Sequence, residues 1–351
     1  MALGSKARII WSRASRHASS LPRIVEPHHH YVVTTEPFHE PLKRAGLAPY
    51  MPDDFLTDAG SLEVSKAIHL ECMPTDPMAE ARWVERIIDA AHGPCVAIVA
   101  ACDLAADDAA SQLRQLKELC PHVVGIRYVV DYAGPFGVAP ATHFFVSRHG
   151  EGGTVFGGGR GVDFLRDPAY APKFEVGFAA LAEHGLTFDL QCAPEQLGAA
   201  AALVGRHPDV RVILDHMGKP RLHGDPSSAT ADAAELLTWR EGMAQLAAHP
   251  NTFVKLSMLG YAMPGWAADS AKEEALAALV RETIDTFGAE RCMFSTNWWA
   301  GGSMANSDGR DDVNVSMEAL WRHYHAWVST HYSDEQVRRL FAGTAEHVYG
   351  I

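Results

Sequence analysis

Residues 24–31 read IVEPHHHY, a short apolar entry that runs into three consecutive histidines. The apolar entry is typical of a β-strand, and the period of two in a strand places His28 and His30 on one face and His29 on the other. Two imidazoles two residues apart at a strand end can bind one metal ion or one anionic substrate group. The same residues could instead form a histidine-rich turn in solvent, so the rest of the chain must decide.

Seven more apolar runs follow, and helical segments alternate with them. The runs cover residues 66–73, 96–104, 123–130, 187–192, 210–217, 253–259 and 292–298. Eight runs with seven helical segments between them predict an α/β chain whose parallel sheet closes into a (β/α)8 TIM barrel. The alternative is an open doubly wound sheet with an added helical domain. No GxGxxG motif follows the first run, which argues against that alternative.

A long loop interrupts the alternation between the fourth strand and the fourth helix. Residues 131–166 contain nine glycines and two prolines and have neither helical nor strand periodicity. This is much longer than an ordinary connection between a strand and a helix. We therefore expect a glycine-rich lid or binding loop.

The first 20 residues have a different composition from the rest of the chain. They include Lys6, Arg8, Arg13 and Arg16 and no acidic residue. This resembles an organelle transit peptide, and a disordered tail is the alternative. We expect residues 1–22 to be disordered or transit-like and residues 23–351 to form the barrel domain. The expected location is cytoplasmic, or mitochondrial or another organelle if residues 1–20 act as a transit peptide.

Composition narrows the function classes. The chain has 351 residues, 47% of them hydrophobic, and a net charge of -13. The negative charge argues against a nucleic-acid partner. No apolar run approaches the roughly 20 residues that cross a bilayer. The six cysteines form no CxxC pair, so we expect reduced core thiols in a reducing compartment. The expected partner is a small-molecule substrate.

Barrel geometry sorts the histidines. In TIM barrels the chemistry takes place at the C-terminal ends of the strands, whereas the loops that lead into strands serve stability. His28, His30 and His216 lie at strand exits and are the catalytic candidates. Histidines that precede strands are expected to be structural, and these are His92, His122, His184, His207 and His249.

Other polar residues near strand exits are expected to bind the substrate. Arg127 suits a substrate carboxylate because its five fixed donors match two oxygens, although a salt bridge to Asp103 or Asp131 is the alternative. Lys219 is expected to hold the same carboxylate. The full predicted substrate-binding set is Arg127, Gln191, Lys219, Glu71 and Tyr50.

Several motifs together resemble one family. EPHHH resembles the (D/E)xHxH opening of the amidohydrolase-2 group of the amidohydrolase superfamily, and the likeness continues through YMPDDF, HLECMPTDPMAEARWVE, VILDHMGKP, VKLSML, RCMFSTNW and LFAGTAEHVYGI. It covers nearly all of residues 24–351. The resemblance implies a (β/α)8 barrel whose relatives include sugar-lactone and dicarboxylate-lactone hydrolases, amide hydrolases and some decarboxylases. It also implies that His28 and His30 are the first-strand pair, Arg127 a substrate anchor, His216 the sixth-strand histidine and Asn297 the eighth-strand residue.

Two departures from the family pattern bear on the metal. Many members have an aspartate on strand eight, where this chain has Asn297, and an amide cannot take a proton. Many also have a histidine or a modified lysine on strand five, where this chain has Gln191 or Cys192. A binuclear site is therefore not expected. One Zn²⁺ or other divalent cation on His28, His30 and His216 is one alternative. A metal-free mechanism, as in some lactonases that the chain resembles, is the other.

The function predicted from the sequence is hydrolysis of a small carboxylated lactone or ester. In this hypothesis His28 and His30 polarise the carbonyl, directly or through Zn²⁺. His216 takes a proton from the attacking water, which Asn297 orients. Two alternatives stay open, a metal-dependent decarboxylase of a small carboxylic acid and a non-catalytic small-molecule-binding member of the family.

Overall fold

The computed structural model describes residues 21–44, 46–132, 162–222, 224–298 and 315–351. The predicted lid loop falls mainly on residues 133–161, and the predicted transit-like segment falls mainly on residues 1–20. Both lie outside the described residues.

Eight parallel strands form one sheet in the order β1 to β8. Each predicted apolar run overlaps one strand. The strands are β1 Ile24–His29, β2 Val64–Leu70, β3 Cys95–Ala101, β4 Val123–Arg127, β5 Thr187–Leu190, β6 Val212–Leu214, β7 Thr252–Leu256 and β8 Cys292–Phe294. Strands β2, β3 and β7 begin one or two residues before their runs. Each strand stops a few residues before its run does, because the polar residues at the exits have already turned away from the ladder. The prediction of a (β/α)8 barrel is confirmed.

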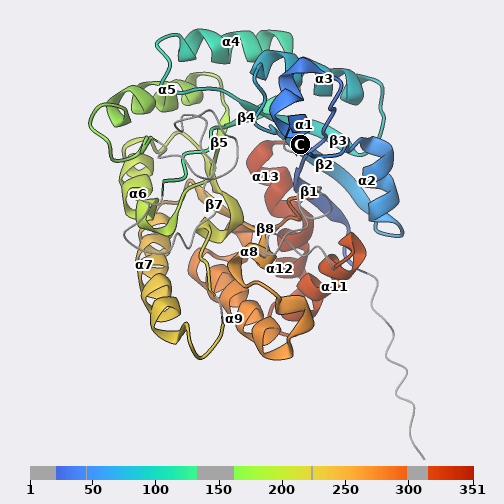
Figure 1. Ribbon diagram of the computed structural model, residues 1–351, viewed down its shortest axis with the longest axis vertical. Coiled ribbons are helices and arrows are strands. Elements are labelled where there is room, and N and C mark those ends of the chain that lie inside the picture. Colours follow the sequence, from blue (N-terminus) through green and yellow to red (C-terminus); the bar gives the residue numbers. More distant parts are fainter. Residues whose placement is uncertain (1–20, 45, 133–161, 223, 299–314) are drawn as a thin grey trace, which may run out of the picture.

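Helices surround the sheet (Figure 1). Among the described residues, the α-helices between successive strands are α1 Glu40–Arg44, α2 Pro52–Ala59, α3 Pro77–Asp89, α4 Ala109–Leu119, α5 Ala171–Glu183, α6 Leu197–Arg206, α7 Ala229–Ala247, α8 Leu259–Ala262 and α9 Ser270–Phe287. After β8 come α11 Met317–Val328, α12 Asp334–Arg338 and α13 Thr344–Tyr349. Local signals begin several of them. At α3, for example, the Asp76 carboxylate accepts the Ala79 N–H at 3.0 Å. Within the described chain, no helix combines the length and the apolar character needed to cross a membrane.

One side chain of β1 reinforces the closure of the barrel. The backbones of β1 and the β8 exit meet at a parallel bridge between His29 and Trp298. The buried Glu26 carboxylate adds to this bridge, since it accepts the Thr296 N–H at 3.1 Å and the Thr296 hydroxyl at 2.7 Å. The same carboxylate accepts the His28 N–H at 2.9 Å. Glu26 therefore joins the first and last strands just below the site.

The interior of the barrel is apolar at the end where the strands begin. Val25, Ile213, Phe253 and Met293 pack there with residues of α13. The helix is fixed in place because Glu346 pairs with Arg23 at 2.7 Å and with Lys66 at 2.9 Å. In Figure 1, α13 lies inside the ring of outer helices, near the centre of the molecule. This helix therefore covers the bottom of the barrel.

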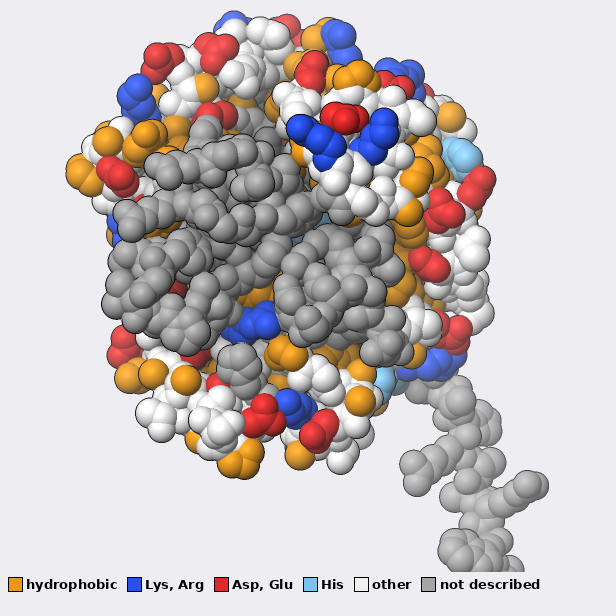
Figure 2. All heavy atoms as spheres, in the orientation of Figure 1, with side chains coloured by type: hydrophobic (Ala, Val, Ile, Leu, Met, Phe, Trp, Pro, Cys, Tyr) orange, Lys and Arg blue, Asp and Glu red, His pale blue; other side chains and the backbone are white. Residues whose placement is uncertain are grey.

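The state of the cysteines and the distribution of surface charge were also predicted or constrained by the sequence. All six cysteines are free and buried, as predicted. On the face in Figure 2, the Lys and Arg side chains of the described residues are interspersed with Asp and Glu rather than gathered into one basic surface.

Candidate active site

The three histidines of β1 alternate as the sequence predicted. The ring centroids of His28 and His30 lie 5.1 Å apart. His29 points to the other face, where its ring lies 4.4 Å from Tyr31 and 5.1 Å from Phe55. All three rings are buried. His28 and His30 therefore belong to the site, whereas His29 belongs to the packing around the barrel.

His216 joins this pair from β6, far along the chain. Its ring centroid lies 4.7 Å from that of His28, and its Nδ1 lies 2.9 Å from the Ser257 hydroxyl oxygen. His216, Met217 and Lys219 have φ values of 56°, 53° and 55°, in the left-handed region that residues with side chains rarely adopt. This strained turn at the exit of β6 aims His216 toward the axis of the barrel. The three predicted histidines thus meet at one end of the sheet.

Three charged residues that the sequence prediction missed lie directly below His28. Asp215 directly follows β6, Lys255 lies within β7 and Asp189 within β5, and all three are fully buried. The Lys255 ammonium pairs with Asp189 Oδ1 and lies 3.1 Å from Asp215 Oδ1. Each residue lies two positions after an inward-facing residue of its strand, so its side chain also points into the barrel. The sequence does contain a signal for these three residues, since each is a charged residue inside an otherwise apolar run.

Arg127 is buried in the site and is already paired. Its Nε donates to Glu71 Oε1 at 3.0 Å, and its NH2 donates to the Glu71 backbone carbonyl. NH1 faces His28 Nε2 at 3.3 Å and lies 3.9 Å from Asp215 Oδ2. The partner is Glu71 rather than Asp103 or Asp131. One edge of the guanidinium is therefore occupied, and NH1 is the part directed at the histidines.

Both ring nitrogens of His28 face a cation. Arg127 NH1 lies 3.3 Å from Nε2, and Lys255 Nζ lies 3.3 Å from Nδ1. A neutral imidazole has only one lone pair, so it accepts from one cation at a time. Asp215 Oδ1 lies 3.3 Å from Nδ1. When the proton is on Nδ1, Nε2 can accept a hydrogen bond from Arg127 NH1, and the N–H group at Nδ1 faces the Asp215 carboxylate.

His30 and Asn297 form a second pair. His30 Nδ1 lies 2.9 Å from the Leu70 carbonyl, which can only accept, so Nδ1 carries the proton. Nε2 then carries the lone pair and lies 3.1 Å from Asn297 Oδ1, which also only accepts. A neutral His30 takes this hydrogen bond when the Asn297 amide is turned by half a rotation, so that its NH2 group faces Nε2. Asn297 has a φ of 54°, a conformation that asparagine tolerates better than most residues.

The remaining predicted substrate residues lie in two places. Lys219 and Gln191 both donate to Asp131 Oδ2, the latter at 2.9 Å, and the Lys219 ammonium lies 5.2 Å from the centre of the Tyr261 ring. These residues come from the exits of β6, β5 and β4. The Tyr50 hydroxyl donates to Asp58 at 2.8 Å. The structure thus brings Gln191 and Lys219 together around Asp131 and directs Tyr50 to a separate carboxylate.

Burial and neighbouring charges shift the pKa values of the site. Burial lowers the pKa of His30 to about 4 and those of His28 and His216 well below their usual value, so all three rings are neutral at pH 7. Burial alone would raise the pKa of Asp215, but the positive charges of Lys255 and Arg127 outweigh it and hold that pKa below its usual value. The site therefore pairs neutral imidazoles with an ionised carboxylate.

The donor set fits a divalent metal ion by residue type. His28, Asp215 and His216 each offer one ligand atom, and these atoms lie within 4.8 Å of one another. Asp215 Oδ2 is buried and makes no hydrogen bond to the residues that the structure describes. Two imidazoles and a carboxylate suit Zn²⁺. His30 lies outside this group, and Asp215 contributes the third ligand atom.

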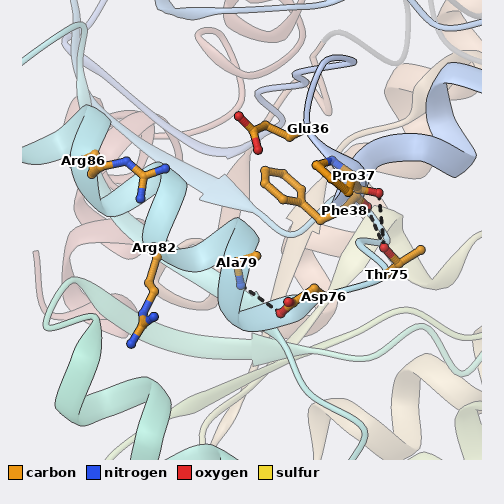
Figure 3. Close-up of a pocket in the computed structure, with 8 residues that line it drawn as sticks. All are labelled: Glu36, Pro37, Phe38, Thr75, Asp76, Ala79, Arg82 and Arg86. Carbon is orange, nitrogen blue, oxygen red and sulfur yellow. Dashed lines mark hydrogen bonds between the residues drawn. The ribbon is translucent and has the colours of Figure 1, made fainter.

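A separate cavity of about 360 Å³ lies outside the barrel wall, between the 3-10 turn η1 (Pro37–His39) and α3 (Figure 3). Its lining residues are Glu36, Pro37, Phe38, Thr75, Asp76, Ala79, Arg82 and Arg86. None of these residues belongs to the histidine site, so this cavity is not the place where the predicted reaction would occur.

The geometry of the site agrees with a comparison of the whole sequence with family models. Residues 25–351 match the model described as Amidohydrolase. The chain belongs to the amidohydrolase family. The match covers all eight strands apart from Ile24, the first residue of β1, and confirms the family resemblance that the motifs indicated. Membership makes the chain a hydrolase.

Individual relatives of this amidohydrolase share less sequence. The protein y4mH of Sinorhizobium fredii is 27% identical over 344 residues, which cover 93% of this chain and 98% of that protein. An L-fucono-1,5-lactonase of Burkholderia ambifaria is 33% identical over 136 residues, which cover 39% of this chain and 41% of the lactonase. A solved amidohydrolase of Burkholderia multivorans with bound zinc has a TM-score of 0.67 at 19% identity and covers 94% of this chain and 99% of that one. At that identity the likeness supports the fold alone.

Proposed function

We propose that this hydrolase opens a small carboxylated lactone, or cleaves an ester of the same kind, by attack of water on the carbonyl at the C-terminal mouth of the barrel. The observation that carries the proposal is the meeting of His28 and His216 beside Arg127 and the ionised Asp215. The partial match to two L-fucono-1,5-lactonases supports a lactone as the substrate class.

His216 is the proposed base. With Nδ1 donating to Ser257, the Nε2 lone pair takes a proton from the attacking water. Because burial lowers the pKa of His216, the ring is neutral at pH 7 but a weak base. A weak base suits a lactone, whose carbonyl is more reactive than that of an amide.

The proton that His216 accepts returns to the product within one turnover. Water adds to the carbonyl carbon as its proton passes to His216, and Arg127 NH1 stabilises the charge that develops on the oxygen. The ring C–O bond breaks next, and the departing alkoxide takes the proton from His216. The product is a hydroxy acid. Asn297 cannot exchange protons and is proposed to orient His30 and the water.

Lys219 is the proposed anchor for the substrate carboxylate, with Gln191 beside it. Glu71 is proposed to fix Arg127 rather than to touch the substrate, since it occupies Nε and NH2. Tyr50 is proposed to contact the substrate from the rim. A divalent ion held by His28, Asp215 and His216 would supply a Lewis acid for the carbonyl oxygen, and the lone pair of His216 would then bind the ion instead of taking the proton from water.

A panel of five- and six-membered lactones that bear a carboxylate or hydroxyl groups tests the proposal, with acid release followed by a pH indicator. His216→Ala is expected to lower kcat/KM by about 10²–10⁴-fold, the usual contribution of a positioned base. His184→Ala is the matched control, because His184 ends α5 at the opposite end of the barrel. Circular dichroism checks folding. Equal kinetics in both variants would remove His216 from the mechanism.

A further inference from the structure

The buried lysine of β7 has no role in the mechanism above. Lys255 is fully buried although it lies within a strand whose other residues are mostly apolar. Two residues before it on the same face, Phe253 packs in the apolar layer above α13. An ionised ammonium at such a depth is costly unless it is paired, so its partners reveal what it does.

Lys255 contacts Asp189 and Tyr349 on the side of α13 and the residues of the site on the side of the barrel mouth. Its ammonium pairs with Asp189 Oδ1, and the Tyr349 hydroxyl of α13 donates to that same oxygen at 2.6 Å. The ammonium also lies 5.6 Å from the centre of the Tyr349 ring. On the side of the mouth it lies 3.1 Å from Asp215 Oδ1 and 3.3 Å from His28 Nδ1. Asp189 and Tyr349 thus fix a positive charge against two residues of the site.

Those two residues are also two of the three candidate metal ligands. The Lys255 ammonium lies 3.1 Å from Asp215 Oδ1, so a Zn²⁺ ion on either oxygen of Asp215 would share that carboxylate with the ammonium and lie only a few ångströms from it. Like charges at that distance in a buried site repel strongly. The other ring nitrogen of His28 faces Arg127. A bound metal ion must therefore compete with built-in cations.

We propose that Lys255 is a positioning residue that acts as an internal cation. It holds Asp215 in place beside His28 Nδ1, and it makes the affinity of the His28–Asp215–His216 group for divalent metal lower than these three donors alone would give. The inference rests on the site in which the proposed function is placed, but it does not depend on which substrate is turned over.

Lys255→Met tests this, with Zn²⁺ alone as the probe. Titration calorimetry of metal-stripped protein is expected to show at least tenfold tighter binding of Zn²⁺ to the variant than to the wild type. The double variant Lys255→Met/Asp215→Asn is expected to lose the gain, because it lacks the ligand oxygen. Lys66→Met is the control, since Lys66 pairs with Glu346 at the bottom of the barrel, and its Zn²⁺ affinity should equal that of the wild type.

Steady-state kinetics show whether Lys255 positions the site residues, which would change kcat, or binds the substrate, which would change KM. Lys255→Met is expected to lower kcat with little change in KM, because Lys255 lies below the residues that would face the substrate. Equal Zn²⁺ affinity in Lys255→Met and the wild type would overturn the proposal. If Lys255→Met does not fold, Lys255→Met/Asp189→Asn removes the carboxylate left without its partner, and the same comparison is made there. Because no substrate enters the titration, a lactone panel that shows no turnover would leave this result unaffected.

Discussion

Replacing Glu26 by alanine should weaken the seam where the barrel closes. The carboxylate accepts the buried N–H groups of Thr296 and His28 at 3.1 Å and 2.9 Å. Alanine leaves both donors without that acceptor. A buried donor that loses its partner costs about 1–3 kcal/mol. Two such donors give an expected loss of about 2–6 kcal/mol in the free energy of unfolding.

Glutamine at position 26 separates charge from shape. Burial raises the pKa of Glu26 from 4.5 to about 7, although hydrogen bonds from Thr296 and His28 and the charge of Lys255 oppose the shift. With a raised folded-state pKa, the carboxyl group stabilises the fold fully below pH 4.5, and this contribution is lost as the pH rises through 7. One pKa unit corresponds to about 1.4 kcal/mol. Between pH 5 and pH 8, Glu26→Gln should therefore gain about 2–3 kcal/mol relative to the wild type.

Urea unfolding at pH 5 and pH 8, followed by circular dichroism and tryptophan fluorescence, measures both effects. Glu318→Ala serves as the control, because Glu318 lies on the exposed face of α11, where it pairs with Arg322, and its removal should leave the unfolding midpoint unchanged. A Glu26→Ala variant whose free energy of unfolding is within about 0.5 kcal/mol of that of the wild type would refute the reasoning. Two buried donors that lose their acceptor should cost several times as much.

Two further substitutions test the assignment of faces and partners. Arg127→Lys keeps the charge but cannot bond Glu71 and His28 together, so kcat/KM on a lactone substrate should fall by about 10–100-fold while the far-ultraviolet spectrum is unchanged. A wild-type rate would show that the fork geometry is not used. His29→Phe replaces a ring that packs on Tyr31 and Phe55 outside the barrel, so steady-state kinetics should match the wild type within about twofold. A loss comparable to that of a site histidine would contradict the alternation of β1.

The fold and the histidine pair were predictable because both follow from short-range patterns. Alternating apolar runs and helices give the barrel, and the period of two assigns His28 and His30 to one face. His216 followed from its place at a strand exit. The sequence also predicted the residue types near the mouth, since the exits of parallel strands meet at one edge.

The charged layer below the histidines was not predicted because it depends on depth rather than pattern. Asp189, Asp215 and Lys255 lie inside runs that read as apolar strands, and their pairing joins strands that are far apart in the sequence. The partner of Arg127 was also missed, because the choice between Glu71 and the nearby aspartates depends on rotamers that no periodicity encodes. The left-handed turn at His216 depends on tertiary packing in the same way.

The seam between Glu26 and Thr296 has a consequence for how the protein is made. The two residues are 270 positions apart, and Tyr349, which steadies the lysine under the site, comes later still. At about 5–20 residues per second, a ribosome needs roughly a quarter of a minute to a minute to synthesise the chain between Glu26 and Tyr349. Until then the three adjacent imidazoles of the nascent chain lack the buried surroundings that lower their pKa values in the folded protein. The histidines of β1 therefore reach their final contacts only after the last helix of the chain has been synthesised.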